Sequence, residues 1–154
     1  MLLIALAGVL GVAYLVTKGP RLYSWLKALQ LTVIIIWIFH TALGAVSMWI
    51  VWSGFVWDEP RMFFTWAILI VAACGYLISE TGKSENVTAV ANIVVLVVVV
   101  ILGTIFVSRN IIHPKSAILS SPDVSIKLFT AAITACFLVA GGGLACMLHK
   151  DTRN

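Results

Sequence analysis

Between Val87 and Ser108 the chain reads VTAVANIVVLVVVVILGTIFVS, without a single charged residue. A helix needs about 20 apolar residues to cross the hydrocarbon core of a bilayer, so this run is long enough to span one. The run is rich in β-branched residues, but it does not alternate apolar and polar positions as a strand of a membrane barrel does. It therefore predicts a transmembrane α-helix.

Four more apolar runs occupy most of the remaining chain. They are Met1–Thr17, Ala28–Trp52, Met62–Ser79 and Leu128–Leu148. Turn and breaker residues separate the runs, including Gly19-Pro20, Ser53-Gly54, Thr81-Gly82, Pro114 and Pro122. No basic residue precedes the first run, and Lys18 and Arg21 follow it, which favours a retained helix over a signal peptide. The sequence thus predicts an all-α integral membrane protein, a bundle of about five transmembrane helices forming a single domain over residues 1–154.

The composition agrees with this fold class. Hydrophobic residues make up 62% of the 154 residues, charged residues make up 10%, and the mean hydropathy is +1.10. A soluble domain has roughly 45–50% apolar and about 25% charged residues, and a chain of this size cannot bury such an excess. A soluble globular enzyme and a disordered chain are therefore excluded. The net charge of +4 flanks the apolar runs, so we expect no nucleic-acid partner.

The lysines and arginines predict the orientation in the membrane. Five crossings put the predicted loops Lys18–Lys27 and Glu80–Asn86 on one side, together with the C-terminal tail. That side holds Lys18, Arg21, Lys27, Lys83, Lys150 and Arg153, and the other side holds Arg61, Arg109, Lys115 and Lys127. The excess puts the C-terminus in the cytoplasm of a prokaryote, or on the equivalent side of an organelle's inner membrane. The segments Ser53–Arg61 and Arg109–Lys127 then share the outer side.

The first outer segment is unusually rich in tryptophan. Residues Trp49–Arg61 read WIVWSGFVWDEPR, and three of the six tryptophans of the chain fall between Trp49 and Trp57. Tryptophan favours the membrane–water interface, so an aromatic belt is one interpretation. Flat aromatic rings at a membrane edge also suit a flat aromatic ligand, and a nearby arginine can pair with a ligand carboxylate. Both interpretations stay open at this point.

The second outer segment carries a histidine beside a proline. Residues Arg109–Lys115 read RNIIHPK. A neutral imidazole is the commonest protein ligand for metals and a frequent ligand of haem iron. The ring of Pro114 fixes the backbone next to His113, and the flanking cations are suited to propionates. Most loop histidines are simply solvated, but the predicted topology puts His113 on the same side as the Trp-rich segment.

These residues carry a family resemblance. Trp52–Arg61, WSGFVWDEPR, resembles the tryptophan-rich haem-handling segment, known as WWD, of the cytochrome c maturation proteins CcmC, CcsA and CcmF. Ala42–Trp49 looks like the family's helix before the motif, and Leu69–Ile78 looks like the helix after it. Val107–Pro114 resembles the segment ending in the family's outer-face haem-ligand histidine. The resemblance runs from about Ile38 to the end of the chain.

The resemblance implies a haem-delivery protein of cytochrome c maturation, not an enzyme. It would hold b-type haem non-covalently at the outer membrane face. Other maturation subunits of the membrane, or a haem chaperone, would be its partners. His113 would be an axial ligand of the haem iron. The cofactor-binding residues would be Trp49, Trp52, Phe55, Trp57, Asp58, Arg61, Arg109, His113 and Lys115.

The chain also departs from the family. The family has six or more spans, so with five this chain resembles an N-terminally shortened member. The family's other outer-face histidine precedes the Trp-rich segment, whereas the only histidine before Trp49 is His40, inside a predicted helix. The source of a second axial ligand is therefore open. An accessory structural subunit of a respiratory membrane complex, without haem of its own, is the alternative function, and a small transporter is a third.

An ionisable residue inside a membrane is a functional candidate by default. His40 shares a helix face with Gly44, where we expect a neighbouring helix to approach closely. Two roles remain open for His40: a hydrogen bond between helices, or an axial ligand to haem iron within the bundle. Asn92, the other buried polar candidate, is expected to donate a hydrogen bond to another helix.

The remaining signals are structural. The cysteines Cys74, Cys136 and Cys146 all lie within apolar runs, so we expect them to be unpaired, and no CxxCH motif for covalent haem occurs. His149 is expected to be solvated at a helix end. The run Gly141–Gly143 predicts tight helix packing or a local distortion of the last helix.

Overall fold

The computed structural model describes residues 1–52, 54, 60–107 and 124–151, and its regular elements there are all helices. They are α1 (Leu2–Thr17), α2 (Pro20–Trp52), α3 (Pro60–Gly82), α4 (Glu85–Val107) and α6 (Val124–Asp151). Four of these helices contain apolar stretches long enough to cross a membrane: Pro20–Val46, Met62–Gly82, Glu85–Phe106 and Thr130–Lys150. The helix α1 is apolar but shorter. The expected all-α membrane protein is confirmed.

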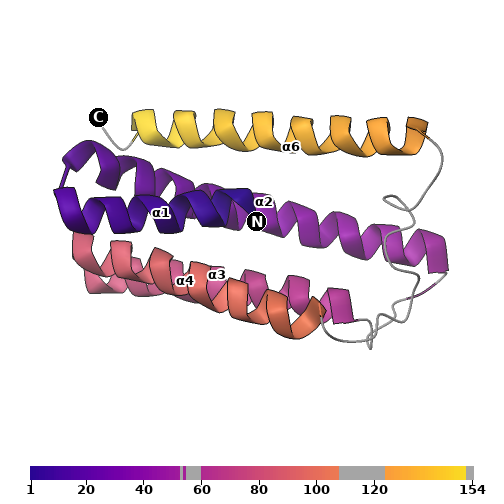
Figure 1. Cartoon of the computed structure of the whole chain (residues 1–154), viewed down its shortest axis with the longest axis horizontal. Helices are drawn as coiled ribbons and strands as arrows, with labels where there is room; N and C mark the ends of the chain where they lie inside the picture. The colour runs from indigo at the N-terminus through magenta and orange to yellow at the C-terminus, as the bar shows by residue number, and fades with distance from the viewer. Residues whose placement is uncertain (53, 55–59, 108–123, 152–154) are drawn as a thin grey trace.

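The helices lie side by side and alternate in direction (Figure 1). One end of the bundle, called here the Trp52 end, gathers the end of α2, the start of α3, the end of α4 and the start of α6. The opposite end, called the Lys18 end, gathers the α1–α2 and α3–α4 connections and the C-terminal end of α6. The helix α1 runs along the part of the bundle nearer the Lys18 end (Figure 1).

The connections at the Lys18 end are shorter than predicted. Loops were expected over Lys18–Lys27 and Glu80–Asn86, but α2 already begins at Pro20 and α3 continues to Gly82. Proline suits the first position of a helix, because its fixed φ is helical and its missing N–H has no partner there anyway. Hydropathy finds only the apolar part of a helix, so it misses these polar terminal turns.

Small residues let α4 approach α1 and α3 closely. A Cβ added to Gly11 would lie 2.8 Å from the carbonyl oxygen of Ala89, and one added to Gly75 would lie 2.5 Å from Cγ2 of Val95. At the Lys18 end, the Tyr14 hydroxyl also donates a hydrogen bond to the Glu85 carboxylate. Close backbone approach of this kind gives membrane helices the van der Waals contact that holds them together.

The apolar core lies among α1, α2, α3 and α4. Its buried members are Ile4, Val33, Ile68, Ala72, Val95 and Val99. The helix α6 packs mainly along α2, where Ala145 is buried against Ala7 and Leu29.

The last helix passes through its glycines without a break. Among the described residues, the run packs tightly at Gly141 alone, where an added Cβ would lie 3.0 Å from Leu3. Nothing described lies within 4 Å of a Cβ added to Gly142 or Gly143. Of the two outcomes expected for this run, the structure has the tight packing, at one position.

Candidate functional site

Most of the predicted haem-binding residues fall outside the part of the chain that the structure describes. Those outside are Phe55, Trp57, Asp58, Arg109, His113 and Lys115. Trp52 is the last residue of α2, and Arg61 is the second residue of α3. Trp49 lies one turn before the end of α2, with 58% of its surface exposed. If these segments form one haem site, Trp52 and Trp57 should lie within about 10–15 Å of His113, the scale of a porphyrin held by an axial imidazole. Because Trp57 and His113 lie outside the described residues, this distance stays a prediction.

The helices that carry these segments end together. The helix α2 ends at Trp52 and α3 begins at Pro60, while α4 ends at Val107 and α6 begins at Val124. All four of these positions lie at the Trp52 end of the bundle (Figure 1). The Trp-rich segment and the His113 segment therefore leave the helices at the same end, as counting the crossings predicts.

His40 lies on α2 beside a cavity of ≈ 500 Å³. The cavity is bordered by aromatic and aliphatic side chains of α2, α3 and α6 and by the start of α1, among them Trp37, Phe64 and Phe137. The imidazole lies against the indole of Trp37, with 5.1 Å between ring centres and a tilt of 41°. The indole Nε1 in turn donates to the carbonyl oxygen of Thr65 on α3, at 2.9 Å.

This arrangement bears on the interhelical hydrogen bond that was one of the two roles open for His40. Within the described helices, its contact is the ring of Trp37 on its own helix, and the interhelical hydrogen bond is made by that tryptophan instead. The close approach expected at Gly44 is wrong, because nothing described lies within 4 Å of a Cβ added there. Helical periodicity predicts which residues share a face, but not which face meets a neighbour.

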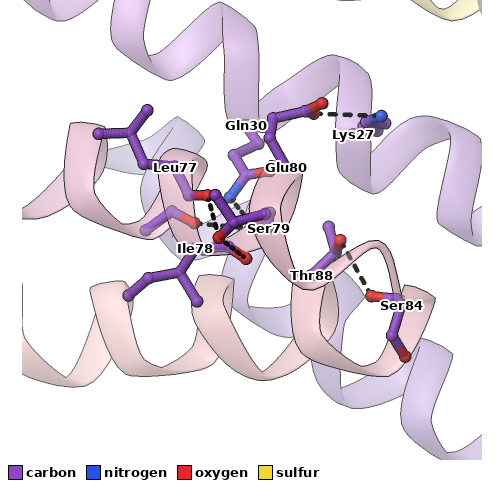
Figure 2. Close-up of polar contacts among 10 residues, drawn as sticks. Lys27, Gln30, Leu77, Ile78, Ser79, Glu80, Ser84 and Thr88 are labelled. Carbon is purple, nitrogen blue, oxygen red and sulfur yellow. Dashed lines mark hydrogen bonds and ion pairs between the residues drawn. The ribbon is translucent and has the colours of Figure 1, made fainter.

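A polar cluster runs from the Lys18 end into the bundle (Figure 2). Lys27 of α2 pairs with Glu80 of α3, at 3.1 Å between Nζ and Oε1. One turn deeper, Gln30 Nε2 donates to Ser79 Oγ at 2.9 Å, and both residues are buried. The sequence pattern did not predict this cluster, although the predicted topology puts residues 27–30 and 79–80 at the same membrane edge.

The expectation for Asn92 is wrong. Its Nδ2 donates to the carbonyl oxygen of Thr88, at 2.9 Å, which is one turn earlier on the same helix. Short polar side chains within a helix readily bond to backbone carbonyls one turn back. Asn92 is nevertheless buried, with 5% of its surface exposed.

His149 lies in the last turn of α6, as expected, but it is half-buried and has contacts that the sequence did not predict. Its Nδ1 forms a hydrogen bond with Ser24 Oγ at 2.8 Å, and its ring stacks on Trp25 with 4.1 Å between centres and 13° between planes. The predicted topology already put Trp25 and His149 at one membrane edge. Two flat aromatic rings at the same edge were the sequence signal from which their stacking could have been predicted.

The cysteines are free thiols, so the expectation that Cys74, Cys136 and Cys146 are unpaired is confirmed. Across the described helices, no group of three or more histidine, cysteine, aspartate or glutamate residues could hold a metal ion. A site for haem iron needs only one or two such ligands and is not tested by that observation.

No family model, no curated protein and no solved structure matches the chain. The resemblance of the Trp-rich segment to the haem-handling motif therefore rests on its own residues.

Proposed function

We propose that the chain is a haem-handling membrane protein, which presents b-type haem at its Trp52 end for cytochrome c maturation. One observation supports this most. The helix ends next to the Trp-rich segment and next to the His113 segment lie at the same end of the bundle (Figure 1). The aromatic rings of one segment and the imidazole of the other can bind the same porphyrin only if both segments lie at one end of the bundle.

The residue types fit haem. His113 offers an imidazole for the iron, and Trp49, Trp52, Phe55 and Trp57 offer rings for the porphyrin face. Cations suited to the two propionates come from Arg61, Arg109 and Lys115. Asp58 would accept a hydrogen bond from an indole or a backbone amide and so stabilise the Trp-rich segment. Haem itself supplies the iron chemistry to the protein that receives it, and this chain only binds, orients and hands it over.

The scaffold suits a site at the membrane edge. The helix α2 has 33 residues, which is about 50 Å at 1.5 Å per residue and well beyond the ~30 Å of a hydrocarbon core. Its last turns, residues 47–52, carry the exposed Trp49 near the Trp52 end of the bundle. In the proposed orientation the Trp52 end faces outward, because the Lys18 side carries more of the basic residues.

His40 is the second choice of iron ligand. It lies nine positions before Trp49, about 14 Å along the helix, so it serves a different position from that of His113. The cavity of ≈ 500 Å³ beside it is bordered by Trp37, Phe64 and Phe137, which suits an apolar ring system. The partners that receive haem would meet it at the Trp52 end, since that site faces water.

The test is a haem titration of the purified chain in nanodiscs, followed by its Soret band. We expect His113→Ala to weaken binding at least tenfold, because the bond between iron and imidazole is lost. His149→Ala is the matched control and should bind as the wild type does, because its imidazole lies at the opposite end. A loss confined to His40→Ala would move the site into the bundle, and equal affinities for all four proteins would contradict haem handling.

One observation favours the accessory-subunit function. The helix α6 packs mainly along α2, and no described residue covers Gly142 or Gly143, where a helix of a partner protein would fit. Under that function the chain purifies from the membrane with other subunits, and no Soret band forms on addition of haem.

A further inference from the structure

Four helices meet around a small cavity in the core of the bundle. The cavity has a volume of ≈ 10 Å³, and Ile4 and Ala7 of α1, Gln30 of α2, Ala72 of α3, and Asn92 and Val95 of α4 line it. Two of these residues, Gln30 and Asn92, are polar, and both are more than nine-tenths buried. They come from two different helices, α2 and α4.

The hydrogen bonds around Ser79 fix the orientation of the Gln30 amide. The Ser79 hydroxyl donates to the carbonyl oxygen of Gly75 at 2.8 Å, so its oxygen is left to accept from Gln30. The group at 2.9 Å from that oxygen must then be the Gln30 NH₂ group and not its carbonyl (Figure 2). The Gln30 carbonyl oxygen, Oε1, is fully buried and has no hydrogen-bond partner in the described part of the chain.

Asn92 also has unused capacity at the cavity. Its side chain makes one hydrogen bond within the described helices, from Nδ2 to Thr88. A side-chain amide carries two donor hydrogens and an acceptor oxygen with two lone pairs. Both a donor and an acceptor of Asn92 therefore remain for a molecule in the cavity.

A buried carbonyl without a donor costs more in a membrane than in a soluble protein, because lipid supplies no replacement. A water molecule needs roughly 10–15 Å³ of free volume and two to four polar partners. The cavity has the volume for one water, and the two amides provide the partners. A metal cation would need several more oxygen ligands, and the remaining lining is apolar.

We propose that this cavity binds one structural water molecule. The water donates a hydrogen bond to Gln30 Oε1 and forms a second hydrogen bond with the Asn92 amide. It thereby links α2 to α4 at the level where α1 and α3 also meet them. This inference is independent of haem, because the cavity is lined by none of the proposed haem-binding residues.

The test is magnetisation transfer from long-lived water to side-chain amide protons, measured by NMR on the labelled chain in nanodiscs. We expect cross-peaks from water to the Gln30 and Asn92 amide protons of the wild type. Gln30→Met removes the carbonyl acceptor and should abolish the Asn92 cross-peak. An absent cross-peak in the wild type, or a cavity that takes up xenon instead, would overturn the proposal.

Two control variants separate the water from general disturbance of the core. Ser79→Ala breaks the bond to Gln30 Nε2 but keeps Oε1, so the Asn92 cross-peak should remain. Thr32→Val removes another fully buried polar group of α2 that bonds within its own helix, and it too should leave the cross-peak unchanged. Equal loss in Ser79→Ala and Gln30→Met contradicts the proposal. If Gln30→Met does not fold, the wild-type spectrum decides alone: its cross-peaks support the water, and their absence overturns it.

Discussion

Two lysines adopt a left-handed backbone at the turns of the Lys18 end. The φ angle is 52° at Lys18 and 47° at Lys83, where a side chain normally costs roughly 1–2 kcal/mol relative to the right-handed form. The Lys18 side chain compensates, because its Nζ donates to Asn86 Oδ1 at 2.5 Å and lies 5.3 Å from the Tyr14 ring centre. Lys83 is exposed, so its conformation is the less supported of the two.

We therefore expect Lys83→Gly to raise the free energy of unfolding by about 1 kcal/mol, because glycine adopts positive φ without strain. Lys18→Gly is the matched control and should gain less or lose stability, since it also removes the contacts to Asn86 and Tyr14. Denaturant unfolding in detergent micelles, followed by tryptophan fluorescence, measures both. A larger gain for Lys18→Gly than for Lys83→Gly would refute the explanation.

At the scale of the helices, stability depends on where small residues meet a neighbour. On α1, Gly11 lies against the backbone of α4 at Ala89, which cannot rotate out of the way as a side chain can. On α6, Gly143 lies against nothing described within 4 Å. The same residue type thus plays two roles, and only the packing tells them apart.

Gly11→Ala should lower the free energy of unfolding by about 1–3 kcal/mol, because α1 and α4 must move apart to admit the methyl group. Gly143→Ala, the matched control, should raise it by up to about 1 kcal/mol through helix propensity alone. Thermal unfolding of the two variants in the same detergent compares them. If both substitutions shift the melting temperature in the same direction, the close packing of α1 on α4 is wrong.

At the scale of the molecule, the succession of long apolar helices was the most predictable property. The apolar runs are long, so the type and order of the described helices follow from hydropathy alone. The ends of α2 and α3 were misplaced at Pro20 and Gly82, because polar terminal turns carry no hydropathy signal. The interhelical hydrogen bond expected of Asn92 was wrong, and the contact of His149 with Trp25 was not predicted. Both depend on which side chains face a neighbouring helix, and no sequence period encodes that.

The candidate site was predicted less completely than the fold. Two predicted crossings separate the Trp-rich segment from His113, so the sequence alone indicates that they share a membrane side. The described ends of the adjoining helices lie at one end of the bundle, in agreement with this (Figure 1). Distances between their side chains depend on loop conformations, which apolar periodicity does not determine. The polar pair Gln30–Ser79 was not predicted, because neither residue belongs to a motif within its own helix. The two residues interact only across the interface between α2 and α3.

The shared side can be tested directly. In a chain whose Cys74, Cys136 and Cys146 are replaced by alanine, Ser53→Cys and Asn110→Cys should react with a membrane-impermeant maleimide from one side of the membrane. Lys83→Cys is the control and should react only from the other side. The alanine replacements should leave folding intact, because the three thiols are unpaired. Labelling of Ser53→Cys and Asn110→Cys from opposite sides would exclude a joint site.

The length of α2 makes the position of its Trp52 end depend on the thickness of the surrounding bilayer. The helix has 33 residues, about 50 Å of rise, which exceeds the ~30 Å of a hydrocarbon core. Hydrophobic mismatch therefore acts on the Trp-rich segment: a thicker bilayer draws it toward the headgroups, and a thinner one raises it further into water. Acyl-chain length thus sets the height at which this segment meets any soluble partner, without a change in the protein itself.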